Sequence, residues 1–100
     1  MLHTLAKMPN HDVLQHCIDI IDLHENSVLL LYQDAIYLAI DDDTQYGTKI
    51  RTLAAKQKIY ILEEDLIARG LQNKIIDTII VTNYEDFVAL TIQHDKTISW

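Results

Sequence analysis

Residues Val28–Tyr32 form an uninterrupted apolar run, VLLLY. Strands with one face in water alternate apolar and polar side chains, whereas strands covered on both faces are apolar throughout. The run is too short to cross a membrane as a helix, which takes about 20 residues. It therefore predicts a central strand, within Ser27–Gln33, of a parallel sheet covered by helices on both faces.

The segments on either side of this run alternate between strand and helix patterns. The predicted outer strands are Met1–Leu5, Lys58–Leu62 and Ile75–Val81, and Thr97–Trp100 closes the chain. The predicted helices are Asn10–Leu23, Asp34–Ile40 (one turn, although an extended segment also fits), Thr48–Ala55, Glu63 to Gly70, and a last one from Asn83. The last helix carries Tyr84, Phe87, Val88 and Ile92 along one stripe, and Tyr84 and Phe87 are expected to belong to the core. This alternation predicts an α/β fold with a mainly parallel sheet of about five strands flanked by helices.

The composition predicts a single domain that spans residues 1–100. Hydrophobic residues make up 49% of the chain and charged residues 23%, which suits one compact domain with a small core. Two glycines and one proline leave little room for linkers. Because a domain of this size buries only part of its surface, partner subunits are expected to be able to complete the burial.

The charge balance argues against direct contact with nucleic acid. Eight Lys and Arg residues face 15 Asp and Glu residues, and the basic residues form no cluster. Binding to a phosphate backbone depends on such clusters. The first residues also lack the charged flank and long apolar stretch of a secretory signal, and a lone cysteine forms no internal disulfide, so a cytoplasmic protein without a membrane span is expected.

Cys17 is the only strong nucleophile candidate in the chain. On a helix it lies near the middle of the apolar stripe that Val13, Leu14, Ile20 and Ile21 form. A reactive cysteine needs partial exposure and nearby positive charge to form a thiolate, and here only His16 and His24 could supply that charge. The sequence therefore favours a packed, structural cysteine over a catalytic one.

The sequence carries no pattern for a cofactor or a metal. The five histidines show no metal-ligand spacing, and one cysteine cannot build a thiolate cage. The acidic run Asp41–Asp43 lacks the glycine and glutamate offsets of a calcium loop, so a solvated loop is expected. Glycine-rich phosphate loops and nucleophile elbows are also missing, and we expect neither a cofactor nor a metal.

Acidic residues follow two of the predicted strands. Asp34 comes after the central strand, and Glu63–Asp65 come after the next one. The carboxyl ends of parallel strands meet at one edge of the sheet, where such folds place ligands. These acids could form a receiver-like magnesium site, but the lysine that such a site needs is replaced by Thr82 and Asn83. Capping of helix ends is therefore the preferred interpretation.

Several blocks of the chain resemble the TusB/DsrH family. The resemblance extends from the first residue to the last, and its two longer blocks are the most specific. The blocks are Met1–Leu5 (MLHTL), Leu29–Asp34 (LLLYQD), Glu64–Leu71 (EDLIARGL), Tyr84–Thr91 (YEDFVALT) and Trp100. One departure is Ala35, where the family often has a glycine.

The resemblance implies a fold of the DsrE/DsrF/DsrH type and a place in a cytoplasmic sulfur relay. It implies one subunit of a hexamer with two copies each of TusB-, TusC- and TusD-like chains. In that relay, persulfide sulfur passes from TusA through a cysteine of TusD to TusE, and onward to 2-thiolation of the tRNA wobble uridine. Sulfur then moves between proteins, which agrees with the lack of a basic patch on this acidic chain.

Three functional hypotheses remain open from the sequence. The preferred one is an accessory subunit that shapes the relay complex. The second is a direct sulfur carrier, because the segment Leu14–Cys17 resembles one that carries a cysteine in DsrH members of sulfur-oxidising relays. The third is a stand-alone receiver-like or small-ligand-binding module that uses Asp34 and Glu63–Asp65.

Overall fold

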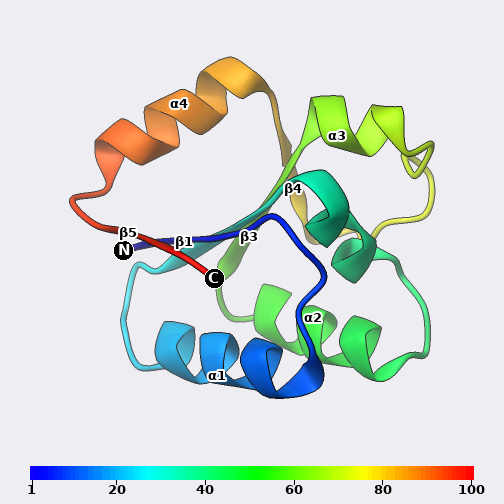
Figure 1. The fold of residues 1–100 in the computed structure, drawn as a ribbon, viewed down its shortest axis with the longest axis horizontal. Coiled ribbons are helices and arrows are strands. Elements are labelled where there is room, and N and C mark those ends of the chain that lie inside the picture. Colours follow the sequence, from blue (N-terminus) through cyan, green and yellow to red (C-terminus); the bar gives the residue numbers. More distant parts are fainter.

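Five parallel strands form one twisted sheet at the centre of the molecule (Figure 1). The computed structural model describes residues 1–100. The strands lie in the order β4-β3-β2-β1-β5 and comprise β1 (Leu2–Leu5), β2 (Val28–Leu31), β3 (Lys58–Leu62), β4 (Ile80–Thr82) and β5 (Thr97–Ser99). All four pairings are parallel. The predicted α/β fold is confirmed, and the apolar run does occupy the central strand.

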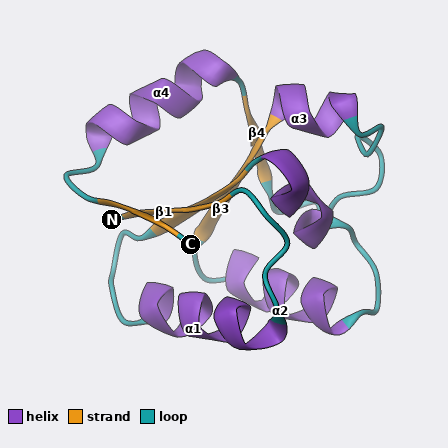
Figure 2. Cartoon of the chain, in the orientation of Figure 1, coloured by secondary structure: helices purple, strands orange, loops and turns teal.

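Helices cover both faces of this sheet (Figure 2). Three of these helices have a side-chain N-cap. The capping residues are Asn10, Thr44 and Asn83, and the side chain of each accepts a hydrogen bond from a backbone N–H in the first turn. The helices are α1 (His11–Asp22), the 3₁₀ helix η1 (Gln33–Ala39), α2 (Gln45–Ala54), α3 (Glu63–Ala68) and α4 (Tyr84–Gln93). None of them combines the length and the hydropathy needed to span a bilayer.

The two faces of the sheet are packed very differently. Leu29 and Leu31 point to the side of α1 and α2, where a cluster of 19 buried residues forms the main core. Val28 and Leu30 point to the side of α4, where they form a buried cluster of only three residues with Leu2. This explains why the central strand is apolar at every position, and it leaves the α4 side with a thin core.

The prediction of a strand over Ile75–Val81 is wrong for its first five residues. Only Ile80 and Val81 of this segment belong to β4. Ile75 forms an isolated antiparallel bridge with Ile40, and Ile76 and Ile79 are buried in the main core. The segment is apolar because its isoleucines pack into the main core, a pattern that sequence periodicity does not distinguish from a buried strand.

Two further local predictions are corrected by the structure. Helix α2 begins three residues before the predicted Thr48, because the Thr44 hydroxyl caps it at Gly47 N–H over 3.1 Å. Alanine is accommodated at position 35, where the family often has a glycine, because Ala35 lies fully buried inside η1. The left-handed conformation of this turn falls instead on Gln33, whose φ is 49°.

Candidate functional site

Cys17, the candidate nucleophile, is fully buried in the main core. It lies on the inner face of α1 together with Leu14, Ile18 and Ile21. Burial raises the pKa of the Cys17 thiol from its ordinary value of 9.0 to about 12. The cysteine is therefore a neutral thiol near pH 7 and lacks the exposed thiolate that attacks a persulfide.

The two histidines that could activate Cys17 are exposed and contact other groups. His16 is exposed and meets the edge of Trp100, with ring centroids 5.4 Å apart. His24 is also exposed, and its Nδ1 donates to the carbonyl oxygen of Ile20 over 3.0 Å. No charged group contributes to the pKa of Cys17, whose shift comes from burial alone. The expected packing role of Cys17 fits these surroundings.

The acids at the carboxyl edge converge as the sequence predicts, but they hold the protein together. The backbone N–H of Gln33 donates to Asp65 Oδ2 over 2.7 Å, at the start of η1. Glu64 Oε1 accepts from the backbone N–H of Tyr84 over 3.4 Å, at the start of α4. These contacts satisfy free N–H groups at the starts of η1 and α4, so the capping interpretation fits Asp65 and Glu64, whereas Asp34 pairs with Arg69.

Arg69 forms ion pairs with two acids of this edge, Asp34 and Asp65. Its guanidinium lies 2.9 Å from Asp34 and 3.7 Å from Asp65. The hydrogen bond to Asp34 raises the pKa of Arg69. No group of three or more His, Cys, Asp or Glu side chains in the chain is placed to hold a metal ion. The sequence patterns above did not single out Arg69, although its position four residues after Asp65 on a helix is the spacing of an ion pair.

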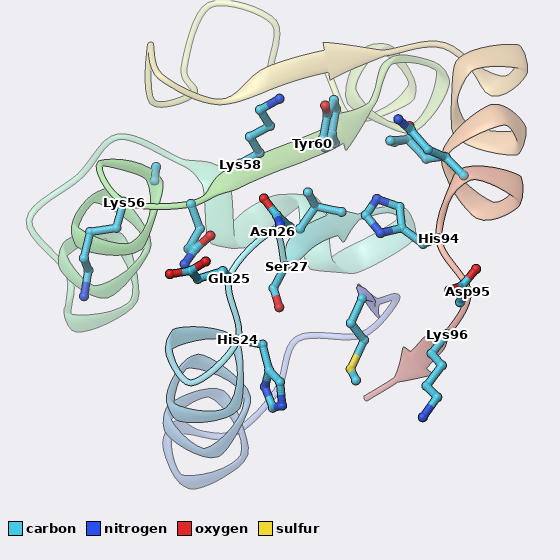
Figure 3. A pocket seen from close by; sticks show the side chains of 16 residues that line it. His24, Glu25, Asn26, Ser27, Lys56, Lys58, Tyr60, His94, Asp95 and Lys96 are labelled. Atoms are coloured by element: carbon cyan, nitrogen blue, oxygen red, sulfur yellow. The ribbon is translucent and has the colours of Figure 1, made fainter.

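A polar hollow of about 1190 Å³ lies at the opposite, amino edge of the sheet (Figure 3). Its lining combines the lysines Lys56, Lys58 and Lys96 with acidic side chains and two histidines. Ala54 at the end of α2, Gln93 at the end of α4 and His24 just after α1 border it, where positive side chains stabilise the negative ends of helix dipoles. Lys56 also pairs with Asp22 over 3.3 Å. Glu25 and Asp95 place negative charge beside these lysines, so the lining is mixed in charge.

The outer face of α4 exposes a row of apolar side chains, which we call the α4 stripe. Tyr84, Val88 and Ile92 follow one another at intervals of four residues and are 62%, 40% and 80% exposed. Only Leu90 of this helix is buried, and Phe87 is half-buried against the small cluster. The expectation that Tyr84 faces the core is therefore wrong, because the thin core beneath α4 accommodates only the opposite side of the helix.

Comparisons with known proteins identify the class of this fold. The chain superposes on a Methanobacterium thermoautotrophicum protein of unknown function, MTH1491, with a TM-score of 0.77 and 12% identity over 99% of this chain and 96% of that one. It superposes on the ychN protein of E. coli with a TM-score of 0.76 and 14% identity, covering 99% and 97% of the two chains. At such identities these likenesses show the α/β fold alone.

Sequence comparisons identify the family. Residues 7–97 match the family described as DsrH like protein. Protein TusB of Shigella flexneri is 40% identical over 100 residues, which is all of both chains, and protein TusB of Escherichia coli strain K12 shows the same identity and coverage. The chain belongs to the TusB/DsrH family, as the blocks in its sequence predict. Membership of this family fits a role in sulfur relay.

Proposed function

We propose that this chain is a structural, accessory subunit of a cytoplasmic sulfur-relay complex that supports 2-thiolation of the tRNA wobble uridine. Its partners in the complex are TusC-like and TusD-like subunits, with two copies of each chain. The complex takes persulfide sulfur from a TusA-like protein and passes it to a TusE-like protein. The cysteine that carries the sulfur belongs to the TusD-like subunit.

The state of Cys17 is the observation that carries the accessory role. A sulfur carrier presents its cysteine to the thiolate or persulfide of the next protein, and it works as a thiolate itself. Cys17 is fully buried, and the pKa of its thiol is about 12. The only cysteine of the chain is therefore suited to packing and unsuited to exchange.

The uneven packing of the sheet supports the role in assembly. The main core has 19 buried residues, whereas the α4 side has three, and the α4 stripe remains exposed above them. Apolar surface of this kind is stabilised when a partner subunit covers it. The net charge of −7 further supports a chain that contacts proteins in the relay and leaves tRNA to others.

Purification from the native host tests the proposal. A tagged copy of the chain is isolated from its own cells, and the native mass and subunit composition are measured. The proposal predicts two copies of this chain with two copies each of two homologous small subunits. A monomer, or an assembly of this chain alone, would contradict it.

Loss of the gene supplies the functional half of the test. Cells without this chain are expected to lose the 2-thiouridine of the affected tRNAs, because the relay complex fails to assemble. The Cys17→Ala variant should restore both the complex and the modification. A matched control is Ile18→Val, which alters a neighbouring buried side chain of α1 by a similar volume and should also restore both.

A further inference from the structure

We propose that His3 and Trp100 form a proton-sensitive latch, in which protonation of His3 releases β5 from the edge of the sheet while the rest of the fold stays intact. In the closed state, β5 pairs with β1 and Trp100 bonds to His3. The latch is a property of this chain alone, and it does not rest on the proposed function.

The bond between Trp100 and His3 is incompatible with a charged imidazole. The indole Nε1 of Trp100 can only donate, and it lies 3.0 Å from Nδ1 of His3. Nδ1 therefore carries no hydrogen, and the neutral ring holds its proton on Nε2. A second proton would bind to Nδ1, and two N–H groups would then point at each other. Protonation of His3 and its contact with Trp100 thus exclude one another.

The surroundings of His3 do not stabilise a positive charge. His3 is fully buried, and its Nε2 has no hydrogen-bond partner. Its neighbours on the adjacent strands, Leu29 of β2 and Ile98 of β5, are apolar. Burial, the amino group of Met1 and His24 at the end of α1 all lower the pKa of His3. A proton on His3 is therefore accommodated only when the ring gains access to water.

The strand β5 is held to the sheet by few contacts other than Trp100. It is an edge strand of three residues that pairs only with β1 (Figure 1). Two of its three side chains are exposed, and one of these, Ser99, shares a hydrogen bond of 3.1 Å with Thr4. Trp100 packs against the main core, and its backbone N–H donates to the carbonyl oxygen of Thr4 over 2.9 Å. Loss of the hold on His3 therefore frees β5 before the core opens.

Release of β5 changes the surface at this edge of the sheet. In the closed state the backbone N–H of Leu2 donates to the carbonyl oxygen of Lys96 over 2.9 Å, and the carbonyl oxygen of Thr4 accepts from Trp100. Without β5, both groups of β1 face solvent. An exposed strand edge of this kind can pair with another strand. The open state thus differs from the closed one in what the sheet can bind.

A falling pH should favour the open state. There His3 meets water and titrates near its ordinary pKa of about 6.5, whereas in the closed state its pKa is lowered. The open state therefore binds the proton more tightly. Between about pH 7.5 and 5, the ratio of open to closed chains should rise by up to about 30-fold.

Amide hydrogen exchange of the full, native chain tests the latch. Protection, the slowing of exchange relative to the unfolded chain at the same pH, measures how rarely a hydrogen bond opens. Protection of the Trp100 backbone N–H should fall by up to about 30-fold between about pH 7.5 and 5. The Tyr32 N–H, which donates to the carbonyl oxygen of Leu5 over 3.1 Å, reports on opening of the central strands and should stay at least about 10-fold better protected. Equal protection of both amides at about pH 5 would mean that the sheet opens as a whole and would overturn the latch.

Variants assign the effect to His3. The amide oxygen of His3→Gln can accept from Trp100 but takes up no proton, so protection of the Trp100 N–H should no longer fall with pH. The controls are His16→Gln and His94→Gln, which should keep the fall. His16 meets the edge of the Trp100 ring, with centroids 5.4 Å apart, and burial also lowers the pKa of His94, which precedes β5.

Two results would overturn the latch independently of each other. A fall in protection that persists in His3→Gln, or that disappears in His94→Gln, would place the titrating group elsewhere. If His3→Gln does not fold, the wild-type chain still decides, because protection of the Trp100 N–H that stays constant with pH contradicts the latch.

Discussion

The indole Nε1 of Trp100 donates a hydrogen bond to Nδ1 of His3 over 3.0 Å. The two residues are 97 positions apart, and the bond ties the residue after β5 to the middle of β1. Because Nδ1 accepts this bond, His3 is neutral and carries its proton on Nε2, which is buried without a partner. The contact therefore fixes both the position of β5 and the protonation state of His3.

Removing the indole N–H should destabilise the protein. The Trp100→Phe variant keeps an aromatic ring but leaves Nδ1 of the fully buried His3 without a donor. We expect the free energy of unfolding in urea to fall by about 1–3 kcal/mol. Tyr84→Phe removes a polar group from an exposed ring and should change stability by less than about 0.5 kcal/mol. Equal stability of the two variants would contradict the importance of the bond.

The same histidine should make stability depend on pH. Burial lowers the pKa of His3 below its ordinary value of 6.5 in the folded protein. As the pH falls below about 6.5, the unfolded chain takes up the proton first, so the free energy of unfolding decreases until the folded pKa is passed. Denaturation curves between about pH 7.5 and 5.5 measure this decrease.

Variants separate His3 from the second histidine that acts in the same direction. Burial also lowers the pKa of His94, which is less buried than His3. His3→Gln should flatten the pH dependence of stability more than His94→Gln does. An unchanged slope in His3→Gln would mean that His3 titrates normally in the folded protein.

The buried state of Cys17 should be visible in its reactivity. In the native protein at about pH 8, a thiol reagent should modify Cys17 about 100-fold or more slowly than in the urea-unfolded chain. The physical reasons are its full burial and the thiol pKa of about 12. Leu23→Cys supplies an exposed thiol that should react at once in the same protein. Rapid, complete modification of native wild-type protein would refute the buried position.

The turn after the central strand offers a stabilising substitution. Gln33 has a φ of 49°, a left-handed conformation that costs most side chains about 1–2 kcal/mol. Its backbone N–H bond to Asp65 does not depend on the side chain. Gln33→Gly should therefore stabilise the fold by about 0.5–1 kcal/mol after the entropy of glycine is counted. Asn26→Gly, at a φ of 63°, should gain less because asparagine tolerates this region.

Local patterns predicted the sheet and the place of Cys17 well. The run at Val28–Tyr32 indicated a strand covered on both faces, and the helical spacing put Cys17 on the inner face of α1. Both features depend on periodicity over a few residues, which the sequence states directly. The convergence of acids at the carboxyl edge also followed from the parallel order of the strands.

Features that depend on distant partners were not predictable in this way. The Ile75–Ile79 segment has the composition of a strand, but its bridge to Ile40 removes it from the sheet. The stripe on α4 has the spacing of a core face, yet its side chains are exposed because the core on this side of the sheet has only three buried residues. The bond between Trp100 and His3 joins residues that no local pattern relates.

The modification state of tRNA in cells that carry only the Cys17→Ala variant tests the central claim most directly. The amount of wobble 2-thiouridine is measured in a strain without the native gene, complemented by either wild-type or Cys17→Ala protein at equal abundance. The accessory role predicts the same amount in both, and almost none without complementation. Loss of 2-thiouridine with a Cys17→Ala chain that still enters the complex would make Cys17 a sulfur carrier and contradict the account.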